Sequence, residues 1–165
     1  FDLPVILFRA MYHGLSAPSL FDQGEMNQQK RYNNYQNRYH HRHVDLMDVM
    51  AMFNLRHFQK LDDVAHLFGF PGKRGDGGYH VPEYVRLQQW QDLTGYCEGD
   101  VLNTWLIYLR WLLLKGQLQL QEHQAWIQAS IQLLQAHPQH TDFLKIWRET
   151  SQQTEFTASD FHHLN

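Results

Sequence analysis

The spacing of hydrophobic residues predicts helices along most of the chain. Apolar residues recur three and four positions apart in several segments, which is the pattern of a helix with one buried face. Helices are predicted at residues 3–12, 46–53 and 61–68, from Pro82 to Gly95, onward to about Gly116, at 119–137 and, for a turn or two, at 143–147. Gly14, Gly69, Gly95 and Gly116 lie at the ends of these segments, where helices commonly finish.

The segments between these helices are polar or rich in turn-forming residues. Residues 16–38 contain many asparagines and glutamines without periodicity and predict a long loop, and residues 39–44 predict a short extended segment. Residues 71–78 hold four glycines and predict a turn-rich loop. Because no repeat or linker divides the chain, we expect one domain over residues 1–150 and a polar tail over residues 151–165.

Tyr96 and Asp100 form the strongest candidate site. Residues four apart share one face of a helix, so a phenol and a carboxylate there can act on one small object, such as a metal-bound water. The residues from Val101 to Leu114 are apolar on nearly all sides, which predicts a buried helix with Asp100 at its head, facing a cleft. Gly99 lowers helix stability by about 1 kcal/mol relative to alanine, and a close backbone approach is a possible reason for it.

Composition narrows the possible classes of protein. A 165-residue chain with 43% hydrophobic residues and five tryptophans fits a globular protein. The lone Cys97 forms no internal disulfide and is expected to be a packing residue, and we expect a cytoplasmic protein. Arg110 interrupts the longest apolar run, so no membrane span is predicted. A net charge of −3 argues against a strongly electrostatic nucleic-acid binder, but not against a nuclease with metal-neutralised carboxylates.

Two further clusters could bind ligands. Lys73 and Arg74 lie in the glycine-rich loop, which could hold a phosphate or could be an ordinary basic turn. The group His40, His41, His43 and Asp45 contains zinc-binding residue types, but its spacing matches no recognised ligand pattern. We expect His43 and Asp45 instead to help fix the strand and the helix near a cleft.

Three short motifs carry a resemblance to a known family. The motifs are Phe1-Asp2-Leu3-Pro4, Arg42-His43-Val44-Asp45-Leu46 and Tyr96-x-x-x-Asp100 followed by Asn103-Thr104. From Phe1 to about Gly116 the chain resembles the 3′–5′ exonuclease domain of family-B DNA polymerases, and in particular a bacterial group of predicted 3′–5′ exonucleases related to it. The resemblance implies an α/β, ribonuclease H-like exonuclease fold. This chain would be its mostly α-helical C-terminal portion, with at most one or two short strands.

The resemblance also implies a set of site residues. Similar exonucleases use four carboxylates and a tyrosine, in an Asp-x-Glu motif, a motif ending in Phe-Asp, and Tyr-x-x-x-Asp. Asp2, Tyr96 and Asp100 match the last two motifs as catalytic residues, with Asp2 and Asp100 as ligands of Mg²⁺ or Mn²⁺. We expect these two carboxylates to approach each other across a shared cleft. Lys73, Arg74 and His43 are weaker candidates for substrate contacts.

The Asp-x-Glu motif of these exonucleases is absent, because the chain contains no Asp-x-Glu string. We therefore expect the chain to be part of a longer protein and to be inactive alone. The implied activity is hydrolysis of single-stranded DNA from its 3′ end by a two-metal mechanism, with an RNA 3′ end as a second possible substrate. A non-catalytic domain that binds nucleic acid or a protein partner, and a structural helical module in which Tyr96 and Asp100 satisfy each other, are the alternatives.

Overall fold

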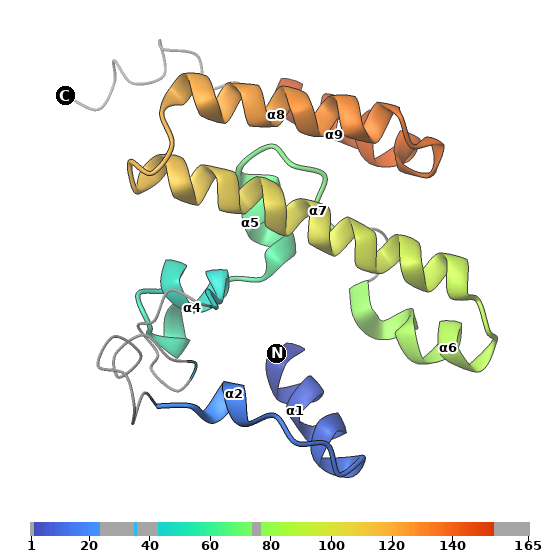
Figure 1. The fold of residues 1–165 in the computed structure, drawn as a ribbon. Coiled ribbons are helices and arrows are strands. Elements are labelled where there is room, and N and C mark those ends of the chain that lie inside the picture. Colours follow the sequence, from blue (N-terminus) through green and yellow to red (C-terminus); the bar gives the residue numbers. More distant parts are fainter. Residues whose placement is uncertain (1, 24–34, 36–42, 74–76, 154–165) are drawn as a thin grey trace. The chain divides into compact units, whose positions relative to one another are not determined.

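The computed structural model describes residues 2–23, 35, 43–73 and 77–153, and it divides the chain into two compact units. The first unit covers residues 1–45 and the second covers residues 46–165. All regular elements of the described residues are helices, without a strand among them (Figure 1). This agrees with the prediction of a mostly helical chain.

The described part of the first unit contains two helices. Helix α1 (Asp2–Tyr12) confirms the predicted first helix, and Gly14 ends it with a φ of +65°. The Leu15 amide donates a hydrogen bond of 2.9 Å to the Ala10 carbonyl, which satisfies one of the last helical acceptors. Helix α2 (Pro18–Phe21) lies within the predicted long loop, so that prediction is wrong for these four residues. Of the predicted extended segment, residues 39–42 lie outside the described part, and His43 and Val44 form no strand.

The second unit is built around one long helix. Its elements are α4 (Leu46–Met50), η1 (Leu55–His57), α5 (Leu61–Leu67), η2 (Gly77–His80), α6 (Val81–Arg86), α7 (Trp90–Leu114), α8 (Leu120–Gln135), η3 (Pro138–His140) and α9 (Thr141–Gln153). Helix α7 packs against α5, α6 and α8, and α8 in turn packs against α9 (Figure 1). The helices predicted at 61–68 and 119–137 are thereby confirmed. The helix predicted from Pro82 to Gly95 is present as α6 but ends at Arg86.

The core of the second unit joins α5, α7, α8 and α9. Its buried members are Ala65, Phe70, Leu106, Ile107, Leu134, Phe143, Leu144 and Trp147. Phe70, in the loop after α5, meets the ring of Trp147 edge-to-face at a centroid distance of 6.1 Å. The Ser151 hydroxyl donates to the Gly69 carbonyl at 3.2 Å. The loop that follows α5 is therefore tied directly to α9.

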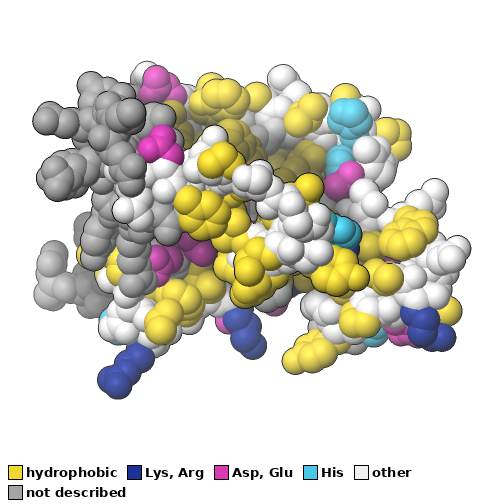
Figure 2. All heavy atoms as spheres, turned by 60° about the horizontal axis from the view of Figure 1, so that its bottom comes forward, with side chains coloured by type: hydrophobic (Ala, Val, Ile, Leu, Met, Phe, Trp, Pro, Cys, Tyr) yellow, Lys and Arg dark blue, Asp and Glu magenta, His cyan; other side chains and the backbone are white. Residues whose placement is uncertain are grey.

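Helix α7 differs from its prediction in where it begins and how deeply it is buried. It begins at Trp90 and runs through Gly95, because the break after α6 occurs at Gln88, which has a φ of +55°. Val101 is 67% exposed and Leu114 is 78% exposed, so the prediction of a helix buried on all sides is wrong. Hydrophobic side chains are exposed at many points of the face in Figure 2.

Two other boundaries also differ. Helix α4 ends at Met50 rather than continuing to Phe53, because Met52 and Phe53 both adopt positive φ. Helix α9 runs from Thr141 to Gln153, so it is longer than the predicted turn or two and includes the first residues of the predicted tail. The rest of that tail, residues 154–165, lies outside the described residues. In the described part, no helix combines the length and the apolar character that a bilayer span requires.

Candidate active site

Tyr96 and Asp100 converge on the side chain of Lys73. The Lys73 ammonium (Nζ) donates a hydrogen bond of 3.1 Å to the Tyr96 hydroxyl and lies 3.2 Å from Oδ2 of Asp100. It also lies 5.5 Å from the centroid of the Tyr96 ring, within the range of a cation–π contact. The phenol and the carboxylate thus share one face of α7, as their spacing predicts, and a cation occupies the point where they meet.

This cluster stabilises the charged form of Lys73. Partial burial by itself lowers the pKa of the lysine, but the hydrogen bond to Tyr96 and the negative charge of Asp100 outweigh it, so the pKa of Lys73 lies above its ordinary value of 10.5. The side chains of Lys73 and Asp100 are each 27% exposed, which leaves the pair accessible from solvent. At neutral pH the cluster therefore holds an ammonium ion beside the carboxylate.

Asn103 holds the loop that carries Lys73 against α7. Its buried side chain accepts a hydrogen bond of 3.0 Å from the Gly72 amide and donates bonds of 2.7 Å and 2.8 Å to the carbonyls of Gly72 and Gly99. The amide of Lys73 donates to Oδ1 of Asp62 at 2.7 Å. Gly72 has a φ of +71°, and a Cβ there would collide with the side chains of His66 and Asp62.

The sequence interpretation gave Asn103 no role in positioning the site. The sequence feature that indicates this role of Asn103 is a single amide side chain within an apolar stretch, one helical turn after Gly99. Such a group needs partners when buried, and the polar backbone of a glycine-containing loop can supply them.

Several predicted site residues are not placed relative to this cluster. Asp2 is the first residue of α1 and belongs to the first unit, whereas Asp100 belongs to the second, so their approach across a cleft stays a prediction. His43 is exposed and lies in the first unit. Arg74 lies outside the described residues, as do His40 and His41. 

Two predictions about α7 residues are wrong. Cys97 is exposed and is not a packing residue. Among the described residues, no atom lies within 4 Å of a Cβ built on Gly99, so a close backbone approach by this part of the chain does not explain that glycine.

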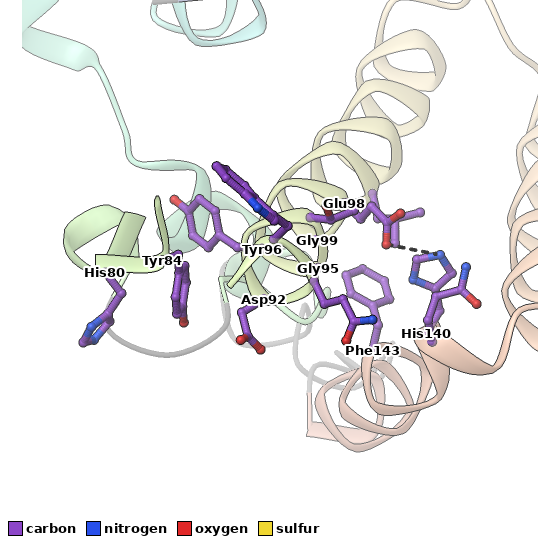
Figure 3. A pocket seen from close by; sticks show the side chains of 14 residues that line it. His80, Tyr84, Asp92, Gly95, Tyr96, Glu98, Gly99, His140 and Phe143 are labelled. Carbon is purple, nitrogen blue, oxygen red and sulfur yellow. Dashed lines mark ion pairs between the residues drawn. The ribbon is translucent and has the colours of Figure 1, made fainter. Parts of the chain in front are cut away.

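A cavity of about 840 Å³ opens beside Tyr96. It is lined by the aromatic side chains of Tyr84, Trp90 and Phe143 and by the backbone of Gly95 and Gly99. Figure 3 shows His80 and Tyr84 on one side, His140 and Phe143 on the other, and the two glycines of α7 between them. His140 Nε2 lies 3.9 Å from Oε2 of Glu98, so this ion pair connects α7 to η3. The cavity therefore adjoins the candidate catalytic pair.

The Asp100 carboxylate is the group here that fits a divalent cation. It presents an oxygen ligand of the kind that Mg²⁺ and Mn²⁺ prefer, and it already faces a positive charge. Over the described ranges, no group of three or more His, Cys, Asp and Glu side chains is arranged to hold a metal ion. Asp100 can therefore supply one ligand of such a site, and the others must come from elsewhere.

Comparison with known proteins assigns the chain to a family. No curated protein and no solved structure matches it. The family described as "Predicted 3′-5′ exonuclease related to the exonuclease domain of PolB" matches residues 1–150. This match covers both the Phe-Asp pair at the start of the chain and the Tyr96–Asp100 pair of α7. The chain therefore belongs to this family of predicted 3′–5′ exonucleases related to the exonuclease domain of PolB.

Proposed function

We propose that this protein acts as a metal-dependent 3′–5′ exonuclease that hydrolyses the phosphodiester bonds of single-stranded DNA. The observation that carries the proposal is the convergence of the Tyr96 hydroxyl and the Asp100 carboxylate, from one face of α7, on a single positive charge. Membership of a family of predicted exonucleases gives this pair its chemical context. The proposal includes a ribonuclease H-like fold, of which this chain forms the helical portion.

Asp100 and Asp2 would hold Mg²⁺ or Mn²⁺ through carboxylate oxygens, together with acids of the Asp-x-Glu motif that this chain lacks. Two such ions, when bound, supply a water of lowered pKa and neutralise charge on the leaving oxygen. The Tyr96 hydroxyl is suited to orient the attacking water, because it lies beside Asp100 and can both donate and accept a hydrogen bond.

The reaction is a single displacement at phosphorus. The water oxygen forms a bond to the phosphorus as the bond to the O3′ of the preceding nucleotide breaks. The O3′ takes up a proton, and a nucleoside 5′-monophosphate leaves. Lys73 would contact a non-bridging oxygen of this phosphate once a metal ion replaces its ammonium beside Asp100. Arg74 and His43 are further candidates for phosphate contacts.

The test is release of mononucleotides from a 5′-labelled single strand by the full-length protein. We expect degradation from the 3′ end with Mg²⁺ or Mn²⁺ and none with a chelator. Asp100→Ala should lower the rate at least about a hundredfold, and Tyr96→Phe should lower it less, because the first removes a metal ligand and the second an orienting hydroxyl.

The matched control is Val101→Ala, at an exposed position next to Asp100, which should leave the rate unchanged. The chain printed here, which contains no Asp-x-Glu motif, should release no mononucleotide. Cleavage that resists the chelator, or an Asp100→Ala protein with the wild-type rate, would refute the two-metal mechanism.

A second function is favoured by one observation, the ion pair of Lys73 with Asp100. A carboxylate already neutralised by an ammonium has less need of a metal ion, as expected in a non-catalytic domain that binds nucleic acid or a protein partner. Titration of the full-length protein with Mn²⁺ separates the two functions. Binding that Asp100→Ala weakens favours the enzyme, and single-strand binding without metal binding favours the non-catalytic domain.

A further inference from the structure

The cavity beside Tyr96 has walls that suit flat aromatic ligands. Tyr84 comes from α6 and Tyr96 from α7 (Figure 3), and Trp90 is the first residue of α7. Phe143 of α9 also lines the cavity, but it is only 3% exposed and belongs to the core. A volume of about 840 Å³ lies in the range of sites that bind small molecules and can hold more than one nucleobase. Bases stack on aromatic side chains regardless of their identity, because every base presents a π-face.

The carboxylates that line the cavity suit hydrogen-bond donors better than a phosphate. Asp92 and Glu98 line it, Glu98 beside His140, and the described residues that line it include His80 and His140 but no Lys or Arg. Carboxylates repel the phosphate backbone of a nucleic acid and accept hydrogen bonds from amino groups. Lys73, by contrast, donates a hydrogen bond to the Tyr96 hydroxyl, and its charged form is stabilised there. Tyr96 thus borders two different environments, a cation at its hydroxyl and a cavity with aromatic and acidic lining.

Two glycines keep the cavity open along α7. Gly95 and Gly99 are four residues apart, so both lie on one helix face, and both line the cavity. A Cβ at either position would meet no atom within 4 Å. A methyl group at either position would therefore meet no other atom of the described residues.

We propose that this cavity binds nucleobases near the 3′ end of the single strand and prefers bases that carry an exocyclic amino group. The base stacks between the aromatic walls while its amino group donates to Asp92 or Glu98, and the phosphate that follows it lies toward Lys73. The identity of the ligand as a nucleic-acid strand rests on the proposed function. The base preference follows from the lining of the cavity.

The test compares the affinities of the full-length protein for two strands in the presence of a chelator, so that no turnover occurs. The probes are short 5′-fluorescent oligodeoxycytidine and oligodeoxythymidine, read by anisotropy. Both are pyrimidines, but only cytosine carries an amino donor. We expect the wild-type protein to bind the cytidine strand on the order of tenfold more tightly, as for one hydrogen bond to a charged acceptor.

Two sets of variants assign this preference to the cavity. Asp92→Asn combined with Glu98→Gln should abolish it, because an amide can pair with either pyrimidine. Gly99→Leu should weaken binding of both strands at least about tenfold by filling the cavity, as expected when stacking on aromatic walls is lost. Val101→Leu places the same side chain at an exposed α7 position that does not line the cavity, and it should leave both affinities unchanged.

The outcomes separate this inference from the proposed function. Equal affinities for the two strands, or wild-type binding by a folded Gly99→Leu protein, would overturn the base site even if the protein degrades DNA. Selective binding that the variants abolish, in a protein without nuclease activity, would support the base site while the proposed exonuclease fails. If neither strand binds, the base site is refuted whatever the nuclease assay shows.

Discussion

In the first half of α7, from Trp90 to Gly99, no residue is buried, whereas the second half contains Asn103, Leu106, Ile107 and Leu109, which are all buried. The first half instead lines the cavity and presents Tyr96, while the second half forms the centre of the core. Asp100 lies between the two halves, and Asn103 ties the Lys73 loop to the junction. The candidate active site thus lies at the point along α7 where the buried half of the helix meets the half without buried residues.

This difference predicts that substitutions in the two halves affect different properties. In the second half they should lower the free energy of unfolding, because they remove buried contacts. In the first half they should change ligand binding or turnover with little loss of stability, because none of its residues is buried. The predictions below test this division.

The largest expected effect on stability is that of Leu106→Ala. Leu106 is 1% exposed and belongs to the core, so its truncation should lower the free energy of unfolding by about 2–5 kcal/mol. Chemical denaturation measures this loss. Val101→Ala, at a position 67% exposed on the same helix, should change stability by no more than about 0.5 kcal/mol. Similar losses for both variants would contradict the assignment of Leu106 to the core and of Val101 to the exposed face within the second half of α7.

Asn103→Ala should have the next largest effect, because it leaves the amide and the carbonyl of Gly72 without their partner. The expected loss in the free energy of unfolding is about 1–3 kcal/mol, measured by denaturation. Turnover should fall as well, since the loop that positions Lys73 is released. The control is Thr104→Ala, whose exposed hydroxyl bonds only to the Asp100 carbonyl in the same helix and whose loss should cost less. An Asn103→Ala protein as stable as the wild type would show that Asn103 does not anchor this loop.

Gly99→Ala should instead raise the free energy of unfolding. Alanine favours a helix over glycine by up to about 1 kcal/mol, and its Cβ would meet no atom within 4 Å, so the melting temperature should rise. At the same time the methyl group narrows the cavity, so affinity for a single strand should not improve. Thermal unfolding followed by circular dichroism measures the first effect, and Gly95→Ala gives an independent repeat. A fall in melting temperature would mean that Gly99 is needed by the fold itself.

The smallest expected effect is the dependence of stability on pH that His123, on the neighbouring helix α8, should cause. Burial first, and then the charge of Arg110, lower the pKa of His123 on α8, whose Nε2 has no hydrogen-bond partner among the described residues. A base whose pKa is lowered by folding stabilises the folded state fully above its unfolded pKa of about 6.5, and this contribution is lost as the pH falls below that value.

We therefore expect His123→Gln to reduce the fall in melting temperature between neutral and mildly acidic pH. His57→Gln, at an exposed histidine, is the control and should follow the wild-type curve. Identical pH dependence in the wild type and the His123→Gln protein would refute this role for His123.

The sequence by itself determined the helices with a clear apolar period and the pairing of the two candidate catalytic groups. The patterns at 61–68 and 119–137 were sufficient because an amphipathic face specifies both the helix and its buried side. The spacing of Tyr96 and Asp100 was sufficient because helix geometry places residues four apart on one face. The start of α7 differs from the prediction for two reasons. Gly95 lowers helix stability by only about 1 kcal/mol, which tertiary packing overrides. The actual break, at Gln88, has no glycine or proline to mark it in the sequence.

Only the tertiary structure decided what surrounds that pair. Lys73 is 23 residues before Tyr96, and its contact with both groups depends on the folding of the loop after α5 onto α7. Asn103 makes this contact possible by pairing with a backbone 31 residues away, a partner that no local pattern specifies. The cavity likewise needs side chains from α6, α7 and α9 at once. Local periodicity specifies which face of a helix a residue occupies, but the neighbour of that face is chosen by long-range packing.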